Sequence, residues 1–280
     1  MEKLVSTDWL AARLDADDIV VLDATQHLPG SERDARAEFK SGHIPGARFL
    51  DLASFIDPES KAPKAVPTRE QFAARMGELG IVPSSRIVLY DNSAIRSAAR
   101  AWFILDHYGE GKVAILDGGF AKWRDEGREI SQRIVEYAPR HRQPPIAHRE
   151  VVSKNAILSQ LASSDRLIVD ARDARRFRGE VEDHVHGLPG GHIPGARNLP
   201  FTQIFNADGT YRSPEEIRDL FVEAGVVPRQ PIIATCGSGM TASVLLFALS
   251  LLGEKGALYD GSWAEWGADP HTPKETGEPQ

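Results

Sequence analysis

The heptapeptide "GHIPGAR" occurs twice in this chain of 280 residues, at 42–48 and again at 191–197, with an offset of 149 residues. A repeat with one fixed, long spacing indicates that a whole structural unit has been copied, so it bears on the fold before any local pattern does. Seven residues alone can match by chance. The repeat therefore predicts a fold only if other segments match in the same order.

Four further pairs of segments follow that order. They are "VVLDATQ" (20–26) with "LIVDARD" (167–173), "TREQFAARMGELGI" (68–81) with "SPEEIRDLFVEAGV" (213–226), "RIVLYD" (86–91) with "PIIATC" (231–236), and "ILDGGFAKW" (115–123) with "LYDGSWAEW" (258–266). Five collinear pairs predict two copies of one domain, at 1–130 and 150–280. Residues 131–149, rich in proline and arginine and without periodicity, are predicted to be the linker.

Within each copy, short β-branched runs alternate with helical patterns. In the second copy "RLIVDA" (166–171) and "PIIATC" (231–236) are typical of buried strands. The segment 213–225 has a serine cap, a proline at the first helical position, a glutamate three residues after the cap and a final glycine. Such alternation predicts an α/β fold in which each domain has a mostly parallel sheet with helices on both faces.

The bulk composition excludes several classes of protein. The chain is 41% hydrophobic and 26% charged, with a formal net charge of −7. An acidic surface argues against non-specific nucleic-acid binding, which needs basic residues. Apolar runs of about 18 residues are absent, so we expect no membrane-spanning helix. The N-terminal segment shows no basic region followed by an apolar stretch, so a cytoplasmic location is expected.

Cysteine occurs once, at position 236. One cysteine excludes an internal disulfide and fits a reducing compartment, in which a free thiol persists. The sequence shows no pattern for a metal site or an organic cofactor, so we expect neither.

The thiol lies at a place where α/β domains bind ligands. Cys236 directly follows the strand "PIIAT" (231–235), and ligands bind at the carboxyl ends of parallel strands. Gly237 and Gly239 permit a tight loop whose N–H groups can surround an anion, with a helix N-terminus behind them. Ser238 and Thr241 can add hydroxyl donors. Such a loop stabilises a thiolate or a persulfide, although a free cysteine can also serve only as a small buried residue.

A cysteine phosphatase is the competing chemistry for such a loop. It needs an arginine six positions after the cysteine to clasp phosphate with two hydrogen bonds. That position is Ala242, and residues 235–249 contain no arginine. Phosphate chemistry is therefore disfavoured.

The tandem of "GHIPGAR" domains with one cysteine loop, "CGSGMTA" (236–242), resembles the two-domain rhodanese-type sulfurtransferases over essentially the whole chain. The loop itself is similar to that of the branch that uses 3-mercaptopyruvate. The resemblance implies that the Cys236 thiolate attacks the sulfur of 3-mercaptopyruvate, a small anionic donor. Pyruvate leaves, and the resulting persulfide passes its outer sulfur to a thiol, thioredoxin or cyanide. It also implies a cradle for the persulfide formed by Gly237, Ser238, Gly239, Met240 and Thr241.

In the first copy the position of the cysteine is taken by Asp91, which cannot carry sulfur. The resemblance thus implies that 1–130 is catalytically inactive and forms one wall of an inter-domain cleft. Two other functions stay open. One is a thiosulfate sulfurtransferase, and the other is a non-catalytic persulfide carrier that loads its cysteine but turns over negligibly.

By the same resemblance Arg176, in "RRFRGE" (175–180), holds the substrate carboxylate. The alternative is that Arg176 is one of four solvated arginines in 172–178. Arg178, His184 and His186 are further candidates for substrate binding. His43 and His192 invite a metal or acid–base interpretation. However, both copies have this histidine, whereas a cysteine is found in the second copy alone, so a structural hydrogen bond is expected.

Three positions depart from the mercaptopyruvate pattern. Val185 stands where that branch has a second substrate arginine, and Ala53 and Lys64 stand where it has an aspartate and a histidine. Loss of one charge-assisted hydrogen bond costs roughly 1.5–3 kcal/mol. The departures bear on the donor rather than on sulfur transfer itself.

Overall fold

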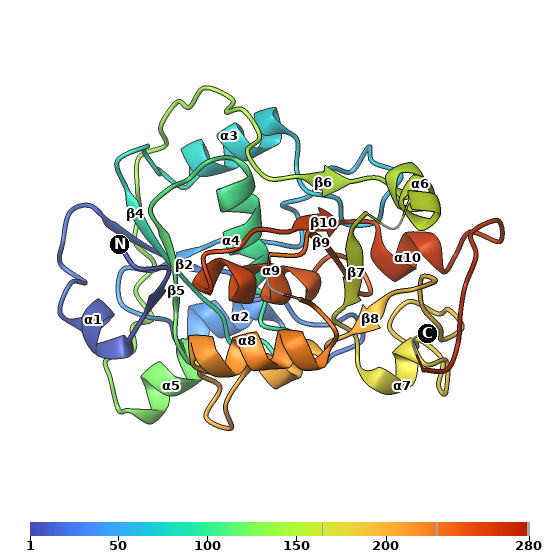
Figure 1. Ribbon diagram of the computed structural model, residues 1–280. Helices are drawn as coiled ribbons and strands as arrows, with labels where there is room; N and C mark the ends of the chain where they lie inside the picture. The colour runs from blue at the N-terminus through green and yellow to red at the C-terminus, as the bar shows by residue number, and fades with distance from the viewer. Residues whose placement is uncertain (164, 228, 279–280) are drawn as a thin grey trace. The chain divides into compact units, whose positions relative to one another are not determined.

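The computed structural model describes residues 1–163, 165–227 and 229–278, and it divides into two compact units (Figure 1). Unit 1 comprises Met1–Asp57, Val66–Arg149 and Ala207–Tyr211. Unit 2 comprises Pro58–Ala65, Glu150–Asn206 and Arg212–Gln280. Each unit is built around its own sheet.

The two sheets have the same construction. Unit 1 contains five parallel strands in the order β1-β5-β4-β2-β3, and unit 2 contains five in the order β6-β10-β9-β7-β8. The strands of unit 1 are β1 (Leu4–Val5), β2 (Ile19–Asp23), β3 (Arg48–Phe49), β4 (Arg86–Tyr90) and β5 (Val113–Leu116). Those of unit 2 are β6 (Val151–Val152), β7 (Leu167–Asp170), β8 (Arg197–Asn198), β9 (Ile232–Thr235) and β10 (Ala257–Tyr259).

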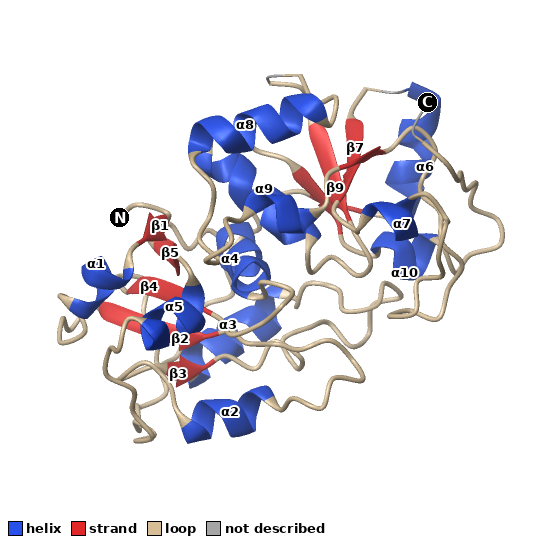
Figure 2. Cartoon of the chain, turned by 90° about the horizontal axis from the view of Figure 1, so that it is seen from below, coloured by secondary structure: helices blue, strands red, loops and turns tan. Residues whose placement is uncertain are grey.

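Helices cover both faces of each sheet (Figure 2). In unit 1 these are α1 (Thr7–Ala11), α2 (Ala35–Ser41), α3 (Arg69–Glu78), α4 (Ala98–His107) and α5 (Gly119–Asp125). In unit 2 they are α6 (Lys154–Ser163), α7 (Ala174–Phe177), the 3₁₀ helix η1 (Phe201–Ile204), α8 (Pro214–Glu223), α9 (Ala242–Leu251) and α10 (Ser262–Trp266). The predicted α/β fold with two repeated, helix-covered parallel sheets is confirmed.

The predicted start of α8 is also found. Ser213 accepts the N–H of Glu216 and the Glu216 carboxylate accepts the N–H of Ser213, with Pro214 at the first helical position. The corresponding helix α3 begins with the same reciprocal pair, Thr68 and Gln71. Each side-chain cap is worth about 1 kcal/mol.

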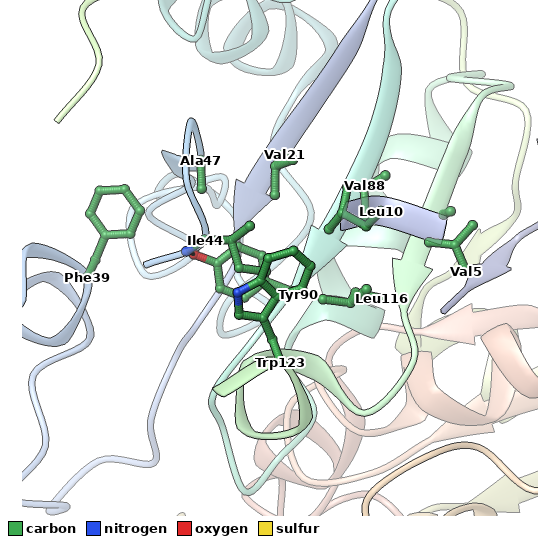
Figure 3. Packing of buried hydrophobic residues seen from close by; sticks show 11 residues of the cluster. Val5, Leu10, Val21, Phe39, Ile44, Ala47, Val88, Tyr90, Leu116 and Trp123 are labelled. Carbon is green, nitrogen blue, oxygen red and sulfur yellow. Dashed lines mark hydrogen bonds between the residues drawn. The ribbon is translucent and has the colours of Figure 1, made fainter. Parts of the chain in front are cut away.

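Each sheet buries one face against three helices. Figure 3 shows this face in unit 1, where strand residues such as Val21, Val88 and Leu116 pack with Leu10 of α1 and Trp123 of α5. The hydroxyl of Tyr90 accepts the N–H of Ile44 at 3.4 Å. Unit 2 repeats this packing with α6, α7 and α10, through Ile157, Ile168, Phe177, Ile233, Trp263 and Trp266. Each large apolar side chain buried here contributes roughly 1.5–3 kcal/mol.

The histidines of the two "GHIPGAR" segments are structural, as expected. His43 Nδ1 lies 2.7 Å from the carbonyl oxygen of Phe39, and its ring stacks on the Phe39 ring at 4.1 Å between centroids. His192 Nδ1 lies 2.9 Å from the carbonyl oxygen of Phe177, with the rings 3.9 Å apart. Both histidines are buried.

Each of these histidines also pairs its backbone with a later segment. His43 exchanges two backbone hydrogen bonds of 2.9 Å with Ser131, and His192 exchanges bonds of 2.8 and 2.9 Å with Glu275. The segment that follows the last helix of each unit is thereby tied back to the repeated motif. Among the described residues, no helix has the length and apolar content needed to cross a membrane.

Candidate active site

The loop 236–241 connects β9 to α9 and begins with the buried Cys236. The N–H groups of Cys236 and Gly239 both donate to the Oγ of Ser262, each at 3.1 Å. The Ser262 hydroxyl donates in turn to the carbonyl of Tyr259 at 2.8 Å. One serine, at the start of α10, therefore fastens both ends of the loop's first turn.

Two backbone bonds add to this anchor. The N–H of Trp263 donates to the Cys236 carbonyl at 2.9 Å, and that of Ala264 donates to the Gly237 carbonyl at 2.8 Å. Ser262 itself has φ +50°, a left-handed backbone that costs a residue with a side chain on the order of 1 kcal/mol. The strain is offset by the two N–H groups that its hydroxyl accepts.

The predicted persulfide cradle lies in this loop. Gly239 has φ +72°, and its N–H already donates to Ser262 while its carbonyl accepts the hydroxyl of Ser243 at 2.9 Å. Ser238 and Met240 are buried, and Thr241 is half-buried next to the start of α9. The cradle role of these residues and of Gly237 stays a prediction.

His186 lies directly against the loop. A methyl group built on Gly237 would lie 2.3 Å from Cε1 of His186 and 3.1 Å from each ring nitrogen. No side chain therefore fits at position 237 while the imidazole is in place. Of the predicted substrate-binding residues, His186 is brought beside the residue that follows Cys236.

Asp183 holds the imidazole of His186. Its Oδ1 lies 2.9 Å from His186 Nδ1 and 3.4 Å from Nη1 of Arg176, and its Oδ2 lies 3.6 Å from Nη1 of Arg172. Burial raises the pKa of this carboxyl, but the bond from His186 and the charges of the two arginines outweigh it and hold the pKa at about 2. Asp183 is therefore a carboxylate at neutral pH.

Arg176, at the end of α7, contacts two carboxylates. Its guanidinium pairs with Asp173, which caps α7, and with Asp183. Burial lowers the pKa of Arg176, but the two carboxylates raise it above its ordinary value overall. Through Asp183, Arg176 and His186 share one oxygen atom as their partner. The Arg176 side chain is 23% exposed, and its role in substrate binding stays a prediction.

A second buried pair supports this cluster. Arg172 donates to both oxygens of Asp170, at 2.7–3.2 Å, and to the carbonyl of Gly191 at 2.6 Å. Its guanidinium lies over the Trp263 ring, 4.5 Å from the centroid. Since the backbone N–H of Trp263 also donates to the Cys236 carbonyl, the ion pair and the cysteine loop are joined through one residue.

The two remaining candidates lie in other surroundings. Arg178 pairs with Glu180 at 2.6 Å and Glu278 at 3.5 Å, and it lines a hollow of about 420 Å³ with Arg197 and Asn198. The His184 side chain is 80% exposed, with Glu182 at 3.8 Å. Their roles in substrate binding stay predictions.

Sequence reasoning missed Ser262, Asp183 and Arg172. Ser262 had a signal, because the repeat places Gly119 at the same position of the first copy, and Gly119 has φ +60°. A serine in place of a glycine at a left-handed position indicates that its side chain is used. Asp183 had only a weak signal, its place just before two histidines.

In unit 1 Asp91 occupies the position of Cys236. One carboxylate oxygen accepts the N–H of Ser93 and the other accepts the N–H of Ala98, the first residue of α4, both at 2.8 Å. Burial raises the pKa of Asp91 despite these bonds. At the position where unit 2 has its thiol, unit 1 thus has a carboxylate that caps the following helix.

The positions that depart from the mercaptopyruvate pattern are divided between the two units. Ala53 belongs to unit 1, while Lys64, with φ +56°, belongs to the segment Pro58–Ala65 of unit 2. Val185 lies between His184 and His186. Within the part of the chain that the structure describes, no group of three or more His, Cys, Asp or Glu side chains could hold a metal ion.

Comparisons with known proteins agree with this architecture. The family of rhodanese-like domains matches residues 6–126 and 153–269. The chain is 38% identical over 273 residues to the 3-mercaptopyruvate sulfurtransferase of Escherichia coli, covering 97% of each, and 36% identical over 271 residues to the thiosulfate sulfurtransferase of Cricetulus griseus, covering 94% and 91%.

Among solved structures, the 3-mercaptopyruvate sulfotransferase SseA of Escherichia coli superposes with a TM-score of 0.84 at 37% identity, over 94% of this chain and 99% of that one. The match to both units, at this identity and coverage, identifies the chain as a two-domain rhodanese-like sulfurtransferase, homologous to the 3-mercaptopyruvate sulfurtransferases.

Proposed function

We propose that this protein takes a sulfur atom from 3-mercaptopyruvate onto Cys236 and passes it to a thiol, thioredoxin or cyanide. The observation that carries the proposal is the position of the one thiol, at the carboxyl end of β9 in a loop fastened by Ser262. Homology to proteins named 3-mercaptopyruvate sulfurtransferases supports the choice of donor.

In the first step the Cys236 thiolate attacks the sulfur of the donor. The carbon–sulfur bond breaks, and its electron pair goes to the departing enolate, which gains a proton and leaves as pyruvate. Cys236 then carries the persulfide Cys–S–SH. Covalent storage on the enzyme splits one transfer into two easier steps.

Arg176 is proposed to hold the carboxylate of the donor. A guanidinium can pair with a carboxylate through two parallel hydrogen bonds. Its contacts with Asp173 and Asp183 fix its orientation beside the loop. Arg178 and His184 are proposed as further contacts to the anion, and Gly237, Ser238, Gly239, Met240 and Thr241 as the persulfide cradle.

Unit 1 is proposed to be inactive in sulfur transfer. The carboxylate of Asp91 is not a sulfur carrier, and both of its oxygens already accept backbone N–H groups. We propose domain boundaries of 1–130 and 150–280, with 131–149 as a linker that packs within unit 1.

Thiosulfate is the second candidate donor. Val185, where a second carboxylate-binding arginine would be expected, favours it, as does the 36% identity to a thiosulfate sulfurtransferase. A persulfide carrier without turnover is the third possibility, because the anchored loop alone could hold a persulfide.

The deciding experiment compares steady-state turnover with 3-mercaptopyruvate and with thiosulfate, using cyanide as the acceptor. We expect the larger kcat/KM with 3-mercaptopyruvate, and a mass increase of one sulfur atom on Cys236 after incubation without acceptor. Faster turnover with thiosulfate would select the second candidate. A mass increase with negligible turnover on either donor would select the carrier.

A further inference from the structure

The contact between His186 and the cysteine loop has the geometry of a proton-transfer site. The imidazole lies against Gly237, one residue after Cys236, and its Nδ1 is 2.9 Å from Oδ1 of Asp183. Its side chain is 14% exposed, so one edge reaches solvent while the Asp183 carboxylate behind it is fully buried. A buried carboxylate behind an imidazole is the arrangement that orients histidine bases in hydrolases.

The carboxylate determines which ring nitrogen carries the proton. Asp183 is ionised and can only accept, so Nδ1 of His186 donates to it. In the neutral imidazole this leaves Nε2 with its lone pair, ready to accept a proton. Nε2 is also the nitrogen that Asp183 does not occupy, and it lies 3.1 Å from the place of a Gly237 side chain.

The orientation of the ring is held by more than one bond. The N–H of His186 donates to the Asp183 carbonyl at 3.0 Å, and Asp183 and Leu188 exchange two backbone bonds of 2.8 and 3.2 Å. Arg176 and Arg172 contact the same carboxylate. Among the described contacts, the charged group that touches the imidazole is therefore Asp183, with these two arginines behind it, and the thiol of Cys236 belongs to the residue before Gly237.

We propose that His186 is a catalytic residue of the second step, accepting the proton of the thiol that receives the sulfur, and that Asp183 is its positioning residue. This rests on the proposed sulfur transfer through Cys236. The acceptor R–SH gives its proton to Nε2, and RS⁻ attacks the outer sulfur of Cys236–S–SH. The sulfur–sulfur bond breaks, and its electron pair returns to Sγ of Cys236. The products are R–S–SH and the Cys236 thiolate, and the imidazolium then releases its proton to water.

The test separates the two steps and the two kinds of acceptor. Cys236 is loaded with 3-mercaptopyruvate, excess donor is removed, and loss of the added sulfur is followed by mass spectrometry. The acceptors are 2-mercaptoethanol, which must lose a proton to attack, and sulfite, which at pH 8 is a dianion with none to lose. We expect His186→Gln to slow discharge to 2-mercaptoethanol by about a hundredfold at pH 8, the lower end of the range for general base catalysis. Discharge to sulfite should stay within about twofold.

The pH profile adds a readout that a merely structural role would not move. As pH rises toward the range in which the free thiol ionises by itself, the deficit of His186→Gln should shrink. His271→Gln is the matched control, because His271 is an exposed histidine of the same unit whose described bond is made by its backbone N–H to Asp269. It should change neither step.

A second variant keeps the test independent of the histidine itself. Gly237→Ala places a methyl group on the imidazole and should displace it, so discharge to 2-mercaptoethanol should fall by a larger factor than discharge to sulfite, which reports the effect of the methyl group on the persulfide cradle itself. Equal losses with both acceptors in His186→Gln, or an unchanged rate with 2-mercaptoethanol, would overturn the proposal while the persulfide still forms. Failure of the wild-type protein to load sulfur would instead overturn the proposed function.

Discussion

The loop of unit 1 that begins at Asp91 and the loop of unit 2 that begins at Cys236 follow equivalent strands and precede equivalent helices, but they are closed in opposite ways. In unit 1 the first residue closes the loop with its own side chain, since Asp91 accepts the N–H groups of Ser93 and Ala98. In unit 2 an outside residue, Ser262, accepts the N–H groups of the loop. A side chain that closes its own loop is committed to structure. One whose loop is closed from elsewhere can do chemistry.

The same contrast appears at two other pairs of positions. The residue before the phenylalanine that stacks on the repeated histidine is Glu38 in unit 1 and Arg176 in unit 2. At the end of the first long strand, Asp170 has Arg172 as its partner, whereas Asp23 has Thr25, whose N–H donates at 2.9 Å. At these two pairs of positions, arginine is present in the copy that carries the thiol and absent from the other.

The largest expected effect comes from substituting, one at a time, the first residue of each of the two loops. Cys236→Ser should abolish both the sulfur adduct and turnover, a loss of a thousandfold or more, because a hydroxyl cannot hold sulfane sulfur. Asp91→Asn should leave turnover within a few-fold, since Asp91 acts on helix α4. The measurement is turnover beside intact mass. Transfer that persists without Cys236, or an equal loss in Asp91→Asn, would end the division between the units.

The buried carboxylate of Asp23 should make the stability of the protein depend on pH. Burial raises the pKa of Asp23 from 3.8 to about 6. Between these values the folded protein keeps a proton that the unfolded chain releases, so this contribution to stability is present at low pH and is lost as pH rises through about 4 to 6. The difference corresponds to about 3 kcal/mol. Asp23→Asn removes this ionisable group, so the variant should gain stability relative to wild type between pH 4 and pH 7. Denaturant unfolding of both proteins at the two pH values measures the difference.

Asp170→Asn sharpens this comparison, because its effect on the free energy of unfolding at pH 7 should have the opposite sign to that of Asp23→Asn. It takes a charge partner from the buried Arg172, so it should lower the free energy of unfolding at pH 7 by roughly 3–5 kcal/mol. If both asparagine variants shift stability in the same direction, the difference between the two carboxylates is not one of charge pairing.

A smaller effect is expected at Arg176. Arg176→Lys should raise the KM for 3-mercaptopyruvate severalfold, because lysine lacks the two-pronged geometry. Arg176→Ala should raise it about tenfold to a hundredfold, as expected for one charge-assisted hydrogen bond. Arg175→Ala, an exposed neighbour, is the control and should stay within about twofold. An unchanged KM in Arg176→Ala would show that Arg176 does not bind the substrate carboxylate.

The smallest expected effect makes unit 2 resemble unit 1 at Ser262. Ser262→Gly removes the acceptor of two N–H groups but relieves the left-handed backbone, so we expect a net loss of about 1 kcal/mol. Ser262→Ala keeps the strain and should lose about 2 kcal/mol. Unfolding in urea measures both. A glycine variant as stable as wild type would show that the serine does not fasten the loop.

The sequence was sufficient to predict the parts that depend on local pattern. Five matched pairs of segments predicted two copies of one domain, and the cap at Ser213 predicted the start of α8. Cys236 could be placed at a strand end because the strand is a continuous apolar run. These features are set by residues close together in the chain.

What could not be predicted depends on contacts distant in sequence. Ser262 reaches Cys236 because β10 lies beside β9, which brings together residues 26 positions apart. Asp183 meets Arg172 only through the folding back of its loop. The periodicity of apolar residues does not predict contacts between distant segments, and a charged pair leaves no distinctive local sequence pattern.

The backbone pairing of His43 with Ser131, and of His192 with Glu275, has an evolutionary consequence. Both partners lie past the residues that the family pattern matches, which stop at 126 and 269. Since the pairing occurs in both copies, it indicates that the duplicated segment included this closing piece. Each copy thus carries its own hydrogen-bonded closure, whatever residue stands at the start of its loop.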